Sequence, residues 1–525
     1  MSLAALNLIQ PERRLPDFTI EITDAEAAKA AEIIRSPESF ITLYTEFTNV
    51  PGMIGVVTSA NDTHDHGNFP TLGGARIRTI GELISPAFIT SLLTGPERTD
   101  AQALINQFRQ NNEQLNGLNE SQQRNLLALA RQSAEREARF LAGSMSEKYV
   151  TLVAGQAEIA DEEEFLPGER EESIGLGGKS VLIAENLTYF QESHSNFLTD
   201  EQIERLFTQH GYHIYLYFIS TNIRHTTAED MRVSPAKLDH TATAVKEAGL
   251  PDLVACYSVE KGGTGNPSLA TAAGVAAGIE ALLDLDGNPY AEGELAIGIQ
   301  GVGNVGNGIA KNLIKDFALG KISCKKLILY LTDIQRGKAE SVQRELTKQL
   351  EISEINNGSV EIKIISEVNL EDPVPHEFLR QEIDVMVPCA VPEILSRALL
   401  AELNPRCKYI SGAANNPWEL DAAGAANLDT IQAFFKRGVQ VSPFPMTNLG
   451  GIFHLELGRA ALRAGRQLDE AFQNRAGLLT RKTVYKLLSE LYARSKSSRV
   501  SMEILYTDWV NQMAACMFKA EGAIN

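Results

Sequence analysis

The sequence predicts an α/β protein of at least two domains, the second built on a Rossmann-type doubly wound parallel sheet. The chain has 525 residues, 44% hydrophobic and 22% charged, and a chain of this length usually divides into more than one domain. From about residue 293 onward, short apolar runs alternate with helix-like segments. Three glycines with the spacing of a dinucleotide-binding turn follow the first of these runs.

Six apolar runs in the second half are predicted to be strands buried on both faces. They are nearly continuous in apolar residues, and helix-like segments separate them, which is typical of a parallel sheet with helices on both sides. Their sequences are LAIGIQ, KLILYLT, VEIKII, IDVMVPCA, KYISGAA and VQVSPF.

The segment IQGVGNVGNGIAK at residues 299–311 is predicted to bind the phosphates of a dinucleotide. Gly301, Gly303 and Gly306 have the spacing G-x-G-x-x-G between a strand and an amphipathic segment. The first glycine allows the bend, the second lets the backbone approach a pyrophosphate, and the third lets helix and strand pack closely. Free N–H groups at the start of the helix then bind the anion. This context favours a dinucleotide site over a glycine-rich turn without a ligand.

Asp333 ends the next predicted strand and is the expected partner of the adenosine ribose. An acidic side chain there accepts hydrogen bonds from both ribose hydroxyls and disfavours a 2′-phosphate, which points to NAD. Asp333 lies later than the usual spacing of about 20 residues, so a lengthened helix or loop is expected before it. Arg336 nearby keeps NADP open as the less favoured cofactor.

The first half of the chain contains two unusual stretches. Residues 98–140 are rich in Gln, Asn and Glu, with apolar residues at helical spacing, and are expected to form amphipathic helix that packs on the protein or pairs subunits. Residues 157–172 carry an acidic run and are expected to be a solvated loop. His64 and His66 lie two residues apart without an evident third ligand, so no metal is expected.

Charge and composition limit the classes of partner. A formal net charge of −19 repels a phosphate backbone, so nucleic acid is not expected as a partner. No run reaches the roughly 18 apolar residues of a membrane span, and the Ala-rich stretch at 268–283 is interpreted as a packed helix. Five scattered cysteines and no recognisable signal peptide predict a reducing compartment, and we expect the cytoplasm.

Nine short segments follow one another in a distinctive order. They are TLGGARIR (71–78), GSMSEK (143–148), GLGGKSVLI (175–183), TTAEDM (226–231), GGTGNPSLATAAGV (262–275), GVGNVG, VMVPCA, ISGAANN and TNLGG. This ordered set resembles the glutamate/leucine/phenylalanine/valine dehydrogenase superfamily, and most closely its leucine and phenylalanine members. The resemblance implies a substrate domain followed by an NAD-binding domain, and reversible oxidative deamination of an amino acid to a 2-oxo acid and ammonia.

The resemblance also implies three residues that carry the chemistry. Lys148 in MSEK matches the lysine that holds the substrate α-carboxylate, and Lys179 in LGGK matches the catalytic lysine. Asp230 in AED matches the carboxylate that shuttles protons. The chemistry needs these groups, because a lysine supplies a cation for the carboxylate and a second, desolvated lysine has a lowered pKa. That second amine can then polarise water and exchange protons near neutral pH.

Further roles follow from the same resemblance. Asn266 and Thr271 match residues near the nicotinamide and its ribose, and either Asn415 or Asn416 matches an asparagine near substrate and cofactor. The remaining cofactor contacts that the resemblance implies are Asn304, Val305, Cys389, Ala390 and Asn448.

The resemblance also points to the pocket for the substrate side chain. Members that act on glutamate carry a lysine before the paired glycines, where this chain has Leu72 before Gly73. The other pocket positions are Ala228, Ile452 and Leu455. A buried glutamate carboxylate without a cation there would cost several kcal/mol, whereas apolar side chains gain about 0.8 kcal/mol per CH₂. We therefore expect a branched aliphatic or aromatic amino acid, with leucine, valine and phenylalanine not separable.

We expect residues 1–272 to form the substrate and oligomerisation domain and residues 273–485 the cofactor domain. Residues 486–525 are expected to be helices that return to the first domain, and the family implies a homo-oligomer. Two alternatives stay open. One is a glutamate dehydrogenase-like enzyme, and the other is a catalytically silent NAD-binding sensor or assembly protein on the same scaffold.

Overall fold

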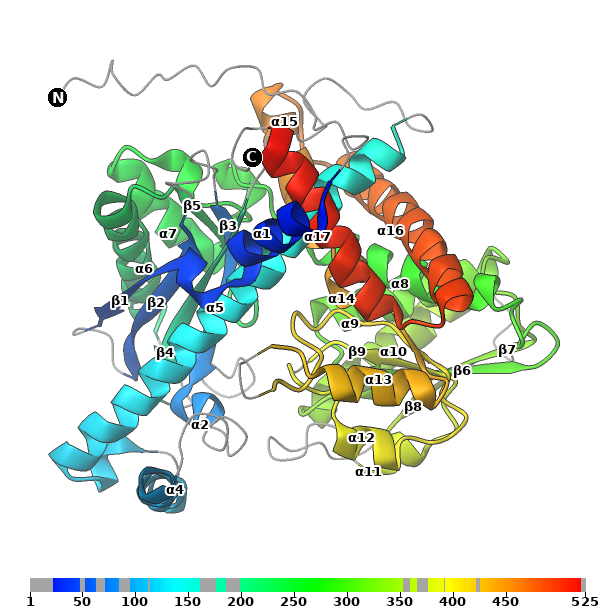
Figure 1. Ribbon diagram of the computed structural model, residues 1–525, viewed down its shortest axis with the longest axis horizontal. Helices are drawn as coiled ribbons and strands as arrows, with labels where there is room; N and C mark the ends of the chain where they lie inside the picture. The colour runs from blue at the N-terminus through cyan, green and yellow to red at the C-terminus, as the bar shows by residue number, and fades with distance from the viewer. Residues whose placement is uncertain are drawn as a thin grey trace.

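Two β-sheets, one in each half of the chain, organise the protein (Figure 1). The structure is a computed structural model. It describes residues 22–47, 52–62, 71–84, 95–111, 114–160, 176–185, 199–352, 359–365, 376–390, 392–421 and 425–520. In Figure 1 the first sheet lies in the left half, and the second lies at the lower right beneath the red and orange C-terminal helices.

The first sheet has five strands in the order β1-β2-β4-β3-β5. Pairs β1–β2 and β2–β4 are antiparallel, whereas β3 runs parallel to both β4 and β5. Helix α5 packs against β2 and β4, and helices α6 and α7 pack against each other and against β5. The bounds are β1 Phe40–Glu46, β2 Met53–Asn61, β3 Thr71–Thr79, β4 Leu176–Ala184, β5 His225–Glu229, α2 Ile80–Leu83, α5 Glu120–Glu158, α6 Asp200–Thr221 and α7 Pro235–Glu247.

The second sheet has six parallel strands in the order β11-β10-β9-β6-β7-β8. Counted from β6 as the first strand, this order is 6-5-4-1-2-3, the doubly wound order of Rossmann folds. Each of the six predicted apolar runs contains one strand, and the predicted fold class is confirmed. The bounds are β6 Glu294–Gln300, β7 Lys326–Thr332, β8 Val360–Ile364, β9 Val385–Pro388, β10 Tyr409–Ile410, β11 Gln440–Val441, α9 Asn304–Ala318, α10 Arg336–Ile352, α11 His376–Arg380, α12 Arg397–Glu402, α13 Leu428–Lys436 and α14 Phe444–Thr447.

The stretch 98–140 is divided between two helices, α4 (Gly95–Gln110) and α5. Asn119 and Gln122 form a capping box at the start of α5, and the helix does not end near residue 140 but continues to Glu158. Its second half is apolar and buried, which explains the continuation. The acidic segment at 157–172 therefore begins on the last turn of α5, and from residue 161 it lies outside the described residues.

Long helices connect the two halves. Helix α8 (Ser268–Leu285) packs on α9, α15 (Gly450–Arg463) and α16 (Glu470–Ser498), while α17 (Met502–Ala520) packs on α1 (Asp24–Arg35) and α5. Figure 1 shows the red helix α17 beside the blue helix α1. The boundaries expected after residues 272 and 485 fall inside α8 and α16, so each helix continues across a domain boundary, and the division stays a proposal.

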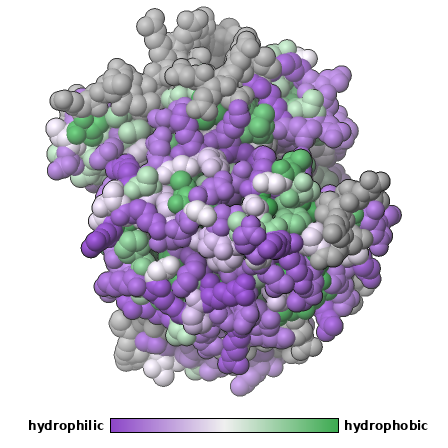
Figure 2. Space-filling model, turned by 90° about the vertical axis from the view of Figure 1, so that its right-hand side faces the viewer, coloured by the Kyte–Doolittle hydropathy of each residue, from purple (hydrophilic) through white to green (hydrophobic). Residues whose placement is uncertain are grey.

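Helix α8 is the one helix among the described residues that is long and apolar enough to cross a membrane. However, 78% of that stretch is buried inside the protein, as expected for a packed core helix. A Cβ added at Gly274 would lie 2.6 Å from the Thr447 carbonyl oxygen, so the small residues of α8 allow close packing. The face drawn in Figure 2 is mostly hydrophilic, with small scattered apolar patches.

Strand β4 and helix α5 approach each other closely, and this contact fixes the relative position of the two elements that carry the candidate lysines. A Cβ added at Gly177 of β4 would lie 1.7 Å from the Ala142 carbonyl oxygen of α5. The Gly177 N–H also donates to the Ser146 hydroxyl at 2.8 Å. Glycine at this position therefore brings Lys179 of the strand and Lys148 of the helix into one region.

We predict that Gly177→Ala destabilises the protein by about 1–3 kcal/mol, because the added methyl group overpacks the contact with α5. Gly293→Ala is the matched control, since its nearest contact would be 3.9 Å away. Chemical denaturation measures both free energies of unfolding. Equal values for the two variants would contradict the proposed contact.

Candidate active site

The site lies where strands β3, β4 and β5 run side by side. The register pairs Leu72 with Gly177 and Gly74 with Ala228. A Cβ added at Gly73 would lie 1.5 Å from the Gly178 carbonyl oxygen. The paired glycines of TLGGARIR and GLGGKSVLI therefore lie where no side chain fits, against backbone carbonyl oxygens at three positions and against the His225 ring at Gly178.

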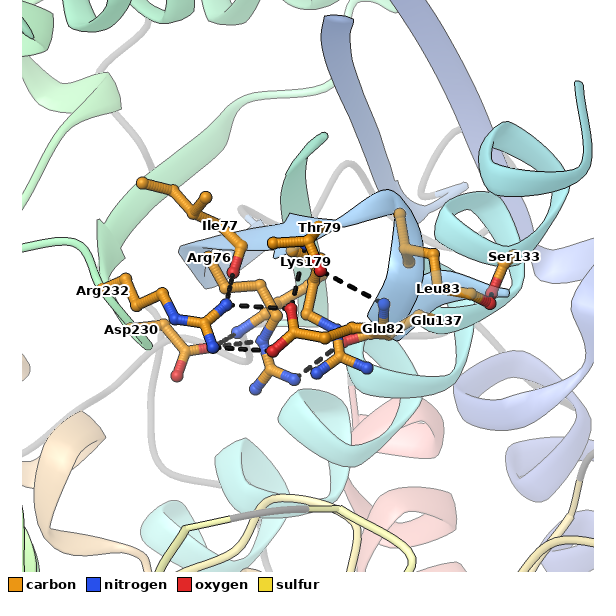
Figure 3. Close-up of polar contacts among 11 residues, drawn as sticks. Arg76, Ile77, Thr79, Glu82, Leu83, Ser133, Glu137, Lys179, Asp230 and Arg232 are labelled. Carbon is orange, nitrogen blue, oxygen red and sulfur yellow. Dashed lines mark hydrogen bonds and ion pairs between the residues drawn. The ribbon is translucent and has the colours of Figure 1, made fainter. Parts of the chain in front are cut away.

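Lys179 and Asp230 form an ion pair at the centre of the site. Lys179 lies on β4 with 2% of its side chain exposed, and Asp230 directly follows β5. The Lys179 Nζ donates to Asp230 Oδ2, and Arg76 Nε of β3 donates to the same oxygen at 2.8 Å (Figure 3). Three adjacent strands thus contribute one side chain each to this cluster.

Lys148 of α5 contacts the second half of the chain. It is 4% exposed, and its Nζ donates to Asn415 Oδ1 at 2.7 Å. Asn448 Nδ2 donates to the same oxygen at 3.0 Å. Of the two candidate asparagines, Asn415 therefore contacts the lysine, whereas the Asn416 carbonyl accepts the Glu393 N–H at 2.6 Å. The site combines residues from both expected domains.

Arg76 is a site residue that the sequence interpretation missed. Its side chain is 6% exposed, and besides Asp230 it contacts Glu137 of α5, with Nη1 to Oε1 at 2.9 Å. The available signal was the pattern ARIRT, where two arginines alternate with apolar residues in a strand that is otherwise buried. A cation on the inner face of such a strand requires a buried anionic partner.

The expected side-chain pocket is aliphatic. Leu72, Ala228, Ile452 and Leu455 are all buried, and all four belong to one continuous apolar cluster. Gly73 follows Leu72 on β3. Glu456, adjacent to Leu455 on α15, accepts a hydrogen bond from the Tyr149 hydroxyl at 2.8 Å, which ties α15 to the helix that carries Lys148.

The glycine turn fits a dinucleotide phosphate. Gly301 has a φ of +88°, and a Cβ on Gly306 would lie 2.0 Å from the Gly301 carbonyl oxygen. Gly303 precedes α9, which begins with Asn304 and Val305, and no side chain caps its N–H groups. The start of α9 therefore offers backbone donors to an anion.

Asp333, Cys389 and Ala390 surround this turn. Asp333 accepts hydrogen bonds from the Val302 and Gln335 N–H groups, both at 3.0 Å, so it links the ends of β6 and β7. A Cβ on Gly301 would lie 2.5 Å from the Ala390 Cβ, and the Cys389 N–H donates to the Gln300 carbonyl at 2.8 Å. All of them lie at the carboxyl edge of the sheet, where such folds bind their ligands.

The remaining predicted residues have contacts of their own. Asn266 is exposed, and its Oδ1 accepts the Ser268 N–H at 2.8 Å at the start of α8. The Thr271 hydroxyl donates to the Pro267 carbonyl. The histidines at 64 and 66 lie outside the described residues, and within the described part of the chain no group of His, Cys, Asp or Glu could hold a metal ion.

Comparison with known proteins gives the family. Residues 262–489 match the model described as Glutamate/Leucine/Phenylalanine/Valine dehydrogenase. A leucine dehydrogenase of Bacillus cereus is 29% identical over 298 residues, which cover 54% of this chain and 68% of the relative. A phenylalanine dehydrogenase of Thermoactinomyces intermedius is 25% identical over 282 residues, covering 53% of this chain and 62% of the relative. The second half of the chain thus matches the model of this amino-acid dehydrogenase superfamily, and the chain is similar to its leucine and phenylalanine members.

The fold agrees with that of a solved dehydrogenase over most of the chain. The hetero-hexameric glutamate dehydrogenase from Thermus thermophilus, in a leucine-bound form, superposes with a TM-score of 0.55 at 13% identity. The match covers 95% of this chain and 94% of the other. The dehydrogenase family implies a nicotinamide cofactor, for which the glycine turn is the expected binding site.

Burial determines the charge state of the two lysines. Burial, together with the nearby Lys179 charge, lowers the pKa of Lys148 to about 7. Burial also lowers the pKa of Lys179 to about 8, against the opposing charge of Asp230. Burial acts to raise the pKa of Asp230, but Arg76 and Lys179 outweigh it and hold that pKa well below its usual value. The neighbouring Glu229 has a pKa raised to about 8 by burial and by the Asp230 charge.

Lys148→Met should make stability less dependent on pH. The pKa of Lys148 falls from 10.5 to about 7 on folding. Between these values the unfolded chain binds more protons, so the wild-type stability rises with pH. Below pH 7 the variant should be more stable than the wild type, by about 5 kcal/mol at most, and this difference should shrink toward pH 10.5.

Thermal unfolding from pH 6 to 10 measures the effect, with Lys246→Met on the exposed face of α7 as the control. A stability difference for Lys148→Met that does not change with pH would contradict the lowered pKa.

Proposed function

We propose that this dehydrogenase catalyses the reversible, NAD-dependent oxidative deamination of an apolar L-amino acid of the leucine, valine or phenylalanine type. The products are the 2-oxo acid and ammonia. The observation that carries the proposal is the convergence of two buried amines and one ionised carboxylate between the two expected domains. An α-amino acid offers the complementary groups, a carboxylate and an amine on one carbon.

Lys148 is proposed to bind the substrate α-carboxylate. It is almost fully buried, and its contact with Asn415 is to a neutral oxygen, so its charge is not paired by that contact. A substrate carboxylate would supply the missing anion and raise the pKa of this lysine. Asn415 and Asn448 would then orient the amine from the cofactor domain.

Lys179 is proposed as the group that moves protons. With a pKa of about 8, it is partly deprotonated near neutral pH and can accept a proton from water that attacks the substrate imine carbon. It returns the proton to the leaving amine as the carbinolamine collapses to the 2-oxo acid. Asp230 stays ionised in this environment, which supports a role in holding the substrate ammonium and Lys179 rather than donating the proton itself.

The cofactor would lie along the carboxyl edge of the second sheet. A bound nicotinamide supplies the hydride acceptor for the substrate Cα. Gly301, Gly303 and Gly306 with the start of α9 would hold the pyrophosphate, and Asp333 the adenosine ribose. We propose NAD because of Asp333, although Lys338 approaches Gly303 and offers a cation to a phosphate, which leaves NADP the less favoured alternative.

The aliphatic pocket supports an apolar substrate. Relatives with 24–29% identity act, by their names, on leucine, phenylalanine and tryptophan, the last in Nostoc punctiforme. Leu72 and Leu455 provide no cation for a glutamate side chain. A glutamate dehydrogenase-like activity is therefore the weaker enzymatic alternative, and retention of Lys148, Lys179 and Asp230 disfavours a silent sensor. We also propose a homo-oligomer, with the cytoplasm as the compartment.

A panel of leucine, valine, phenylalanine and glutamate with NAD tests the function by NADH formation. An apolar amino acid should be preferred, and both Lys179→Ala and Asp230→Asn should lower kcat/KM by about 10²- to 10⁴-fold. Lys246→Ala, an exposed lysine, is the control. Unchanged turnover in Lys179→Ala would contradict the mechanism, a preference for glutamate would contradict the pocket, and NAD binding without turnover would favour the sensor.

Asp333→Ala tests the cofactor. Loss of hydrogen bonds to a charged acceptor should raise the KM for NAD by about 10- to 100-fold while changing the KM for NADP little. The NAD-to-NADP ratio separates ribose recognition from any general loosening of the turn, because Asp333 also binds two backbone N–H groups. An equal loss with both cofactors would contradict the assignment.

A further inference from the structure

We propose that Glu137, on the amino-terminal half of α5, is a positioning residue for Asp230 and acts through Arg76. The inference rests on the proposed function, because it assigns a task to residues around Asp230 and Lys179. It gives the helical stretch at 98–140 a direct connection to the chemistry.

Glu137 bridges two arginines of strand β3. Its Oε1 accepts from Arg76 Nη1 at 2.9 Å, and its Oε2 accepts from Arg78 Nε at 3.1 Å. Arg76 in turn donates through Nε to Asp230 at 2.8 Å. Figure 3 shows the resulting chain from Glu137 through Arg76 to Asp230 and Lys179. Exposure of the Glu137 side chain is only 17%, so solvent screens these contacts weakly.

Because the guanidinium group of Arg76 is planar, the contact with Glu137 also fixes the orientation of the Nε–H group that binds Asp230. Arg76 uses Nε for Asp230 and Nη1 for Glu137, so anions at two positions set the orientation of its plane. Residues 76 and 78 alternate on a strand and therefore share one face, where two guanidinium groups repel each other. The Glu137 carboxylate compensates both charges. Without it, Arg76 would keep Asp230 as its one anionic contact among the described residues, beside the repelling charge of Arg78.

Helix geometry places Glu137 and Lys148 on the same face of α5. They are 11 residues apart, which is close to three turns at 3.6 residues per turn. The helix therefore presents to one site both the amine proposed to bind the substrate carboxylate and the carboxylate that orients Arg76. The uninterrupted run of α5 from Glu120 to Glu158 keeps the two in fixed register.

The negative charge of Glu137 affects the pKa of Lys179, so the positioning role can be measured through the pH dependence of the reaction. Burial lowers the pKa of Lys179, and while Arg76 lowers it further, Asp230 and Glu137 raise it. Removing the Glu137 charge should therefore lower the pKa of Lys179, and it also releases one end of Arg76. A residue that only stabilised the helix would affect folding without moving the pH dependence of the reaction.

The test compares Glu137→Gln with Glu135→Gln in the full-length enzyme. Glu135 lies two residues earlier on α5 and pairs with the exposed Arg131 at 2.8 Å, so it is a matched control. The measurement is the pH profile of kcat/KM for the best apolar amino acid. In Glu137→Gln the acidic limb should move to lower pH by about half a unit or more, and the plateau should fall about 10-fold. Glu135→Gln should match the wild type.

The conservative variant Glu137→Asp keeps the negative charge and serves as the control for a general folding defect. The acidic limb of its kcat/KM profile should lie at the same pH as in the wild type. Its plateau value of kcat/KM should be lower, because the shorter carboxylate reaches Arg76 poorly. If the wild type is active and Glu137→Gln and Glu135→Gln have the same pH profile, the positioning role is overturned while the proposed function stands. A wild type without turnover on any amino acid would overturn the proposed function and this role with it.

Discussion

The site depends on keeping several cations close together in a dry environment. Arg76, Lys148 and Lys179 are nearly fully buried, and the carboxylates that contact them in this cluster are Asp230 and Glu137. Burying charges in this way is costly unless each is paired or neutralised. The protein meets this constraint in two ways. Arg76 and Lys179 form ion pairs with carboxylates, and burial lowers the pKa of both Lys148 and Lys179. The excess positive potential that results is suited to a carboxylate ligand.

The fold makes this arrangement possible through close backbone contacts. Glycines at positions 73 and 177 let β3, β4 and α5 approach more closely than any side chain permits. Long helices then extend the site to the second sheet, because α5 carries Lys148 to Asn415 at the carboxyl edge of the Rossmann sheet. The proposed reacting groups and the glycine turn thus belong to different sheets, which the contact between Lys148 and Asn415 connects.

Much of the fold was predictable because its signals are local. Apolar runs and the turn at Gly301 identify the second sheet, since a strand buried on both faces and a phosphate turn have distinctive sequences. Lys148, Lys179 and Asp230 were found through resemblance rather than from local chemistry. Arg76 and Glu137 were missed because their contacts span 154 and 61 residues, and one arginine in a strand or one glutamate in a Glu-rich helix gives no local signal of its partner. One continuous helix α5, joining the stretch at 98–140 to the segment of Lys148, was not predicted, because its buried half differs in composition from its exposed start.

The most direct measurement is a crystal structure of the enzyme with NAD and a non-reactive analogue of an apolar amino acid. The account predicts the analogue's carboxylate on Lys148 and its α-carbon between Lys179 and Asp230, facing the nicotinamide. An analogue bound away from these three side chains, or a carboxylate held by Arg76 with Asp230 displaced, would contradict it.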